Sequence, residues 1–179
     1  MLSYNVAGLL RSSPGTARRY PVHGVDLPIA DDVRLAAPIE GEVRLARTGR
    51  SILATAVLTT AIEERCSRCL APMVAPVDVT VQEEALPSVD LESGRPLDLS
   101  AEPGALRLDD HHELDLSEPV REAISLAEPI APLCRPDCRG LCPTCGIDLN
   151  AAPEHDHGSP PVDPRLAGLA AWRPPDADR

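Results

Sequence analysis

The feature that most constrains this chain is a set of six cysteines gathered in two places. Cys66 and Cys69 form a Cys-x2-Cys pair near the middle of the sequence. The second group lies in the segment LCRPDCRGLCPTCG and comprises Cys134, Cys138, Cys142 and Cys145. Two intervening residues let a tight turn aim both sulfur atoms at one ion, at Zn–S distances near ~2.3 Å. In a reducing compartment such cysteines indicate metal ligands or redox groups rather than disulfides.

A structural zinc site takes four protein ligands in a tetrahedron. The distal cysteine group supplies four thiols, and His155 and His157 follow it closely. With Cys66 and Cys69 there are eight candidate ligands. They are enough for one zinc ion and, at four ligands each, for two. One arrangement uses the distal group alone, and another is a zinc ribbon that joins the Cys66–Cys69 pair to Cys142 and Cys145. The sequence leaves both arrangements open, with candidate ligands Cys66, Cys69, Cys134, Cys138, Cys142, Cys145, His155 and His157.

Arginines lie directly among the cysteines, namely Arg65, Arg68, Arg135 and Arg139. Four thiolates around one Zn²⁺ leave a net negative charge, which these guanidinium groups can offset. Guanidinium groups also match phosphate oxygens, so contact with RNA or another partner is the second interpretation. All 17 basic residues of the chain are arginine. Arginine is therefore a weaker functional signal here than usual.

A redox function is the alternative to metal binding, because CSRC and CPTC both have the CxxC form of thiol–disulfide enzymes. Such enzymes place the first cysteine at a helix N-terminus, which lowers the pKa of its thiol. The residues after Cys69 indicate a strand, and those after Cys145 do not favour a helix. The sequence also lacks a Gly-rich phosphate loop, a nucleophile elbow and an HExxH motif. We therefore expect neither an enzyme nor a small-molecule substrate.

The charge of the chain restricts its partners. The formal net charge is −11, which repels nucleic acid at long range and favours a basic protein partner. The N-terminal residues lack the basic region and apolar run of a signal peptide. No apolar stretch approaches the ~18 residues needed to cross a bilayer. A cytoplasmic protein without a membrane partner is the expectation.

The expected fold class is α+β, with an antiparallel β-sheet or partial barrel. Strands are predicted from Val33 to Glu84, with a hairpin turn at Gly49. Aromatic residues make up only 2% of the chain, so the core must be aliphatic and would benefit from a metal staple. The last of these strands alternates clearly, with one face formed by Met73, Ala75, Val77, Val79 and Val81.

Short helices are predicted at 2–11, at 116–127 and at 163–172, the last with Asp163 as its cap. The segment 12–22 is expected to be turn-rich, and 87–113 to be a loop with one short strand around Leu106. The chain is expected to divide into a β-rich body, 1–130, and a Cys-rich zinc-binding tail, 131–179. The body carries the N-terminal helix and the helix 116–127, and the tail carries the short C-terminal helix.

Several segments together resemble the YceD family of large ribosomal RNA subunit accumulation proteins. They are YNVAGLLRSSPGTARRY, CSRCL, LDLSEPVREAISLAEPIAPLC, CRGLCPTCGIDLN and DPRLAGLAAW. Many family members carry a Cys-x-Cys pair where this chain has His155-x-His157, which supports a metal role for the two histidines. The resemblance implies a bacterial ribosome-biogenesis factor for large-subunit ribosomal RNA. Its partner would be the large-subunit pre-ribosome, its RNA, or a basic ribosomal protein.

Overall fold

The protein was analysed as a computed structural model that describes residues 2–98, 104–158, 163 and 165–172. Its strands are β1 Ser3–Asn5, β2 Ala17–Val25, β3 Leu35–Thr48, β4 Ser51–Arg65, β5 Pro72–Leu86, β6 Leu106–Arg107 and β7 Glu113–Asp115. Its helices are α1 Ala7–Leu10, α2 Ser117–Leu126 and the 3-10 helix η1 Ala167–Ala171. None of the helices in the described residues is long and apolar enough to cross a membrane.

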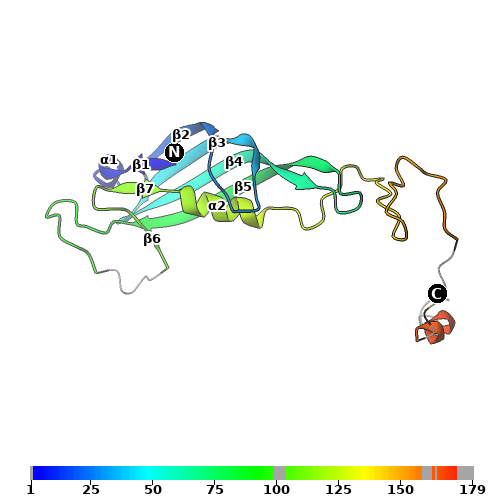
Figure 1. Cartoon of the computed structure of the whole chain (residues 1–179). Coiled ribbons are helices and arrows are strands. Elements are labelled where there is room, and N and C mark those ends of the chain that lie inside the picture. Colours follow the sequence, from blue (N-terminus) through cyan, green and yellow to red (C-terminus); the bar gives the residue numbers. More distant parts are fainter. Residues whose placement is uncertain (1, 99–103, 159–162, 164, 173–179) are drawn as a thin grey trace, which may run out of the picture.

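A curved five-stranded sheet with the order β2-β3-β4-β5-β6 forms the body (Figure 1). The predicted strands between 33 and 84 are confirmed as β3, β4 and β5, which pair antiparallel in sequence order. Gly49, with φ of 62°, lies in the tight turn between β3 and β4. The alternation in β5 is also confirmed, because Ala75, Val77, Val79 and Val81 are buried. Met73, at the end of this row, is only half-buried.

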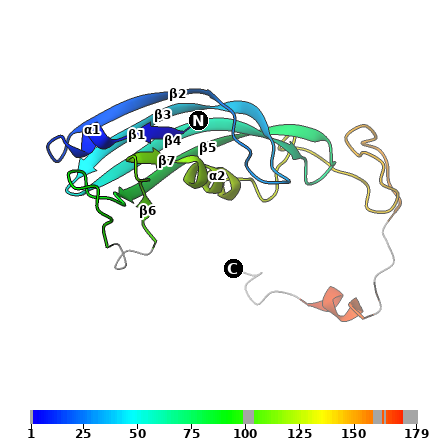
Figure 2. The same cartoon turned by 60° about the vertical axis from the view of Figure 1, so that its left-hand side comes forward.

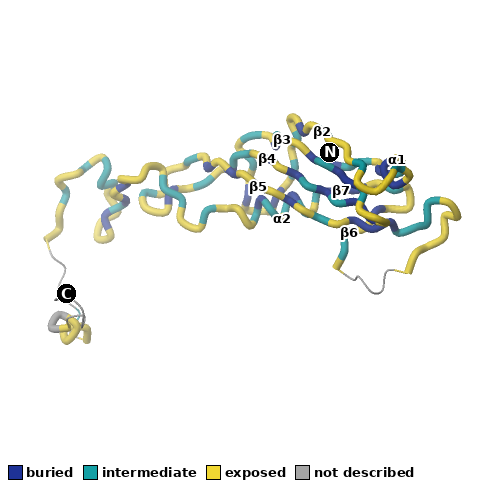
Figure 3. Tube along the Cα trace, turned by 180° about the vertical axis from the view of Figure 1, so that it is seen from behind, coloured by how far each residue is buried: buried dark blue, intermediate teal, exposed yellow. Residues whose placement is uncertain are grey.

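The concave face of the sheet is covered by α2 and by a ribbon of β1 and β7 (Figure 2). The predicted helix 116–127 is confirmed as α2, whose Val120 and Ile124 are fully buried against the core. Asp115 stabilises the helix start, since its carboxylate accepts a hydrogen bond from the backbone N–H of Ser117 at 2.8 Å. Figure 3 shows that buried residues concentrate in this body, whereas the tail is largely exposed.

Of the two forms predicted for the body, the structure has the antiparallel sheet and not the partial barrel, because the sheet is open; its β6 runs parallel to β5. One prediction for the body is wrong. The N-terminal segment 2–11 is not one helix, because β1 pairs with β7 and only α1 is helical. The observed strand and short helix bury the same apolar side chains that one continuous helix would bury. The spacing of these side chains therefore suggested a helix. These side chains are Leu2, Val6, Leu9 and Leu10.

The segment 12–22 contains more regular structure than predicted, because β2 begins at Ala17. Pro21 is tolerated there since β2 is an edge strand, where a missing N–H need not break the ladder. The short strand around Leu106 is confirmed as β6. Near the C-terminus the helix is shorter than predicted and of the 3-10 type, and Pro164 lies outside the described residues.

Candidate metal centres

The first cysteine pair lies at the tip of the hairpin between β4 and β5. β4 ends at Arg65, and the next residues form a tight turn in which the N–H of Leu70 bonds the Cys66 carbonyl at 2.9 Å. The N–H of Cys66 in turn bonds the Ala71 carbonyl at 2.9 Å, which closes the turn before β5 begins. Leu70 adopts a φ of 59°, an αL conformation that ends the knuckle. The local fold thus places both cysteines in one tight turn at the end of the hairpin.

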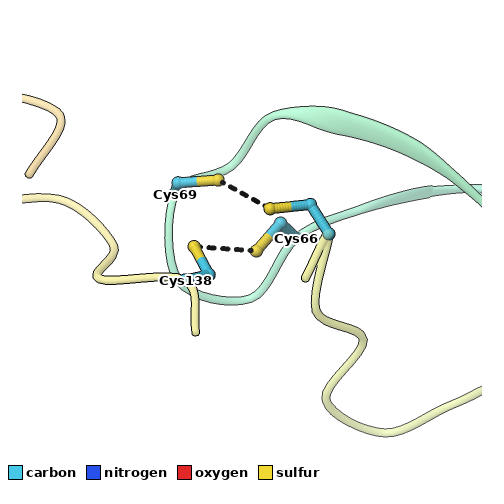
Figure 4. Close-up of side chains that lie close together, drawn as sticks. Cys66, Cys69 and Cys138 are labelled. Atoms are coloured by element: carbon cyan, nitrogen blue, oxygen red, sulfur yellow. Dashed lines mark hydrogen bonds between the residues drawn. The ribbon is translucent and has the colours of Figure 1, made fainter. Parts of the chain in front are cut away.

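The chain that leaves α2 returns to this hairpin tip. The N–H of Ser67 bonds the Pro132 carbonyl at 2.8 Å, which places Cys134 and Cys138 beside the knuckle. The Sγ atoms of Cys66 and Cys138 lie 3.7 Å apart, as do those of Cys69 and Cys134. Figure 4 shows three of these side chains converging on one point. A tetrahedron with metal–sulfur distances near ~2.3 Å has edges of about 3.8 Å, so this spacing fits one zinc-sized ion.

Backbone amides around the four-cysteine group favour thiolates at selected positions. The N–H groups of Cys134 and Cys69 point at the Cys66 sulfur and lower the pKa of that thiol to about 6. Desolvation of its sulfur, with the neighbouring thiols, raises the pKa of Cys134 to about 12, although the residue as a whole is exposed. Four thiolates this close repel one another, so their joint deprotonation requires a cation among them.

A second group contains Cys142, Cys145, His155 and His157. The N–H of Gly146 bonds the Cys142 carbonyl at 2.8 Å, and Gly146 has a φ of 74° that forms the second knuckle. The Nε2 atom of His155 lies 3.2 Å from the Cys145 sulfur and 3.0 Å from Nε2 of His157. The N–H groups of Cys145 and Thr144 lower the pKa of Cys142 to about 6. Two sulfur and two nitrogen donors form another common tetrahedral set.

The structure groups the ligands differently from both arrangements that the spacing suggested. Cys134 and Cys138 face back to the Cys66–Cys69 knuckle, and the following hairpin turns Cys142 and Cys145 toward the histidines. The eight candidate ligands therefore divide into two complete groups of four. Among the described residues, neither CxxC pair begins a helix, unlike the cysteines of thiol–disulfide enzymes.

The four arginines donate hydrogen bonds to residues of the loops that carry these groups. Arg65 reaches the Leu70 carbonyl at 3.3 Å, and Arg68 reaches the Cys138 carbonyl at 2.8 Å. In the tail, Arg135 bonds the Asn150 side chain at 2.7 Å and Arg139 bonds the Pro153 carbonyl at 2.7 Å. Each guanidinium therefore helps to hold a cysteine-bearing loop in place.

Two residues of this region were not singled out from the sequence. Asn150 bonds both the cysteine loop and its own hairpin. Gly140 has a φ of 77°, and a Cβ there would lie 3.0 Å from the Arg68 carbonyl oxygen. The glycine within CRGLC was an available signal, because a glycine between closely spaced ligands often marks an αL position. No signal of this kind pointed to Asn150.

Comparisons with known proteins place both cysteine groups in one family. The YceD family, described as "Large ribosomal RNA subunit accumulation protein YceD", matches residues 54–172. This range runs from β4 through the second ligand group, and it covers more than half of the chain.

Several curated proteins are similar in sequence. An uncharacterized protein of Mycobacterium tuberculosis is 32% identical over 143 residues, which is 79% of this chain and 65% of that protein. An uncharacterized protein of Mycobacterium leprae is 28% identical over 171 residues, 96% of this chain and 72% of that protein. The chain thus spans about 65% of the length of the first of these relatives.

A plant protein is similar over a shorter stretch. The large ribosomal RNA subunit accumulation protein YCED homolog 1, chloroplastic, of Zea mays is 45% identical over 38 residues, 21% of this chain and 13% of that protein. No solved structure matches the chain. The family match over more than half of the chain leads to one conclusion: the chain belongs to the YceD family.

Proposed function

We propose that this protein is a non-enzymatic ribosome-biogenesis factor that supports the accumulation of large-subunit ribosomal RNA in the cytoplasm. The observation that carries the proposal is the family match over residues 54–172, which includes β4, β5, α2 and all candidate metal ligands. The name of the maize relative describes the same role for that protein. The geometry adds a rigid sheet body and a tail whose loops converge on two ligand groups.

Structural zinc is the second part of the proposal. Zinc would be held by Cys66, Cys69, Cys134 and Cys138 in one group and by Cys142, Cys145, His155 and His157 in the other. Closed sets of four sulfur and nitrogen ligands are typical of structural zinc rather than catalytic zinc. Binding of this kind can supply on the order of 10 kcal/mol of folding free energy. The tail needs such support because most of its residues are not buried.

The partner we favour is a basic ribosomal protein or a basic site on the large-subunit pre-ribosome. The net charge of −11 attracts basic surfaces and opposes close approach to RNA phosphates. Direct RNA contact through Arg65, Arg68, Arg135 and Arg139 is the alternative, and it would use the N–H groups left over from their intramolecular bonds. RNA binding that falls steeply with salt, and that is lost when these arginines become glutamine, would favour the alternative.

The decisive experiment measures the ratio of large- to small-subunit ribosomal RNA after depletion of the protein. A selective fall in large-subunit RNA is expected, and the wild-type gene should restore the ratio. The double variant Cys66→Ser/Cys69→Ser should fail to restore it. Ser67→Ala is the matched control, because Ser67 lies in the same knuckle and loses only its hydroxyl bond to the Pro132 carbonyl, while its backbone N–H keeps its bond to the same carbonyl. An unchanged ratio on depletion would refute the proposed role.

Zinc itself is tested separately on the purified full chain under reducing conditions. We expect two bound zinc ions per chain from the two ligand groups. Removal by a strong chelator should increase hydrogen exchange across residues 131–158 and leave the strands protected. Exchange that is unchanged after metal removal would contradict a structural role for zinc.

A further inference from the structure

We infer that the two ligand groups are energetically coupled, and that Asn150 is the positioning residue through which the second group stabilises the first. This inference rests on the proposed zinc binding. Asn150 lies in the hairpin that carries the second group, yet its side-chain amide reaches Cys138, a ligand of the first group, with Nδ2 at 3.5 Å from Sγ. It therefore joins a ligand of the first group to the hairpin that carries the second group.

The orientation of the Asn150 amide follows from its neighbours. The backbone N–H of Arg139 lies 2.8 Å from one amide atom, and Nη2 of Arg135 lies 2.7 Å from the same atom. Both are donors, so the atom between them is the oxygen, Oδ1. The nitrogen then faces two acceptors, the Cys138 sulfur and a carboxylate oxygen of Asp148 at 2.7 Å.

An N–H donor aimed at a ligating sulfur stabilises the thiolate form and fixes the direction of the side chain. Partners of metal ligands contribute strongly for this reason, and their loss typically weakens metal binding by about 10- to 100-fold. Cys138 is almost fully buried, so water does not readily replace a lost donor. Asn150 therefore acts on the first centre without being a ligand.

Asn150 is in turn held by the second knuckle. Its backbone N–H bonds the Asp148 carboxylate at 2.9 Å, and Asp148 pairs with Leu141 across the hairpin that contains Cys142 and Cys145. A metal ion that closes this hairpin therefore also orders Asn150 beside Cys138.

The backbone connects the same two regions. The N–H of Leu149 bonds the Gly140 carbonyl at 2.9 Å, and the N–H of Leu141 bonds the Arg68 carbonyl at 3.1 Å. A continuous ladder thus runs from the Cys66–Cys69 knuckle to the second hairpin. Because coupling between two binding sites is reciprocal, metal in either group must raise the affinity of the other.

The test titrates the reduced full chain with zinc, and in parallel with Co²⁺, whose thiolate absorption distinguishes a four-sulfur from a two-sulfur site. Asn150→Ala should weaken binding at the four-cysteine group by about 10- to 100-fold. The double variant His155→Ala/His157→Ala leaves Asn150 and the first group intact. It should reduce the stoichiometry to one ion per chain and also weaken the binding of that ion to the first group. A chain that carries Asn150→Ala together with the double histidine change should bind metal at the first group more weakly than either variant, but by less than the product of the two separate fold-changes.

Asn5→Ala is the matched control, because Asn5 makes comparable side-chain bonds to the His111 carbonyl and the Ala7 amide within the body. It should leave both affinities unchanged. Wild-type affinity at the four-cysteine group in both Asn150→Ala and the double histidine variant would overturn the coupling while leaving zinc binding intact. A wild-type chain that binds no zinc would overturn the proposed zinc sites, and the coupling with them.

Discussion

The close approach of Gly140 to the first knuckle yields the sharpest prediction of this structure. Gly140 has a φ of 77°, and a Cβ placed on it would lie 3.0 Å from the Arg68 carbonyl oxygen and 3.1 Å from the Arg68 Cβ. The Gly140→Ala variant therefore suffers both a backbone penalty and a crowded contact. Both penalties are relieved when the tail unfolds and separates from the knuckle, so both oppose the assembled metal centre.

The size of the effect follows from these two penalties. An αL conformation costs a residue with a Cβ roughly 1–2 kcal/mol. The contact with Arg68 is tighter than ordinary van der Waals distance and involves a backbone oxygen, which adds on the order of 1 kcal/mol. The sum of about 2–3 kcal/mol corresponds to roughly 30- to 150-fold weaker metal binding at the four-cysteine group, since 1.4 kcal/mol is a factor of ten.

Competition with a chelator of known zinc affinity measures this change, and thermal unfolding of the body is followed on the same samples. Gly49→Ala is the control, because Gly49 also has a positive φ of 62° but nothing lies within 4 Å of its would-be Cβ. The control should lower the melting temperature without changing zinc affinity. Gly140→Ala should instead weaken zinc binding and leave the melting temperature of the body unchanged. Equal zinc affinities in Gly140→Ala and wild type would refute the reasoning that the knuckle and the tail assemble around the metal.

Three further predictions concern the body. Ile124→Ala, which empties a fully buried site under the sheet, should destabilise the protein by about 2–5 kcal/mol in denaturant unfolding. Gly41→Ala should prevent stable folding, measured by circular dichroism, because the new Cβ would overlap the Val57 carbonyl oxygen; a normally folded variant would contradict this packing. Hydrogen bonds from His23 and the Gly24 amide lower the pKa of the Glu40 carboxyl. The ionised carboxylate therefore stabilises the folded protein above the unfolded-state pKa of about 4.3, and this stabilisation is lost as pH falls through the native pKa. The stability difference between wild type and Glu40→Gln should therefore shrink below that pH, and a constant difference would argue against it.

The elements that the sequence predicted well are those whose signal is local. β5 alternates over its length, Gly49 marks a tight turn, and α2 combines an acidic start with a regular apolar side. Each pattern depends on residues only a few positions apart. The N-terminal segment failed for the same reason, because its local spacing fits a helix while its actual partner, β7, lies more than a hundred residues away.

The sequence identified the residues of both candidate groups but not how they are grouped. Cysteine spacing identifies which side chains can share a turn, and both x2 pairs do form knuckles. Which knuckle meets which partner depends on the path of the chain after α2, fixed by the contact of Ser67 with the Pro132 carbonyl. A hydrogen bond between segments so far apart leaves no mark in the spacing of the cysteines.

The first metal centre also bears on the order of events during synthesis. Cys69 and Cys134, from its two halves, are 65 positions apart in the sequence, and β5, β7 and α2 all lie within that interval. When the ribosome releases the knuckle, its second pair of ligands has not yet been made. Since domains tend to fold as their residues emerge, the strands and α2 can pack before the centre closes. If the proposed metal ion binds there, it closes the centre only on a finished body, and a chain with a misfolded sheet would present only half of the site.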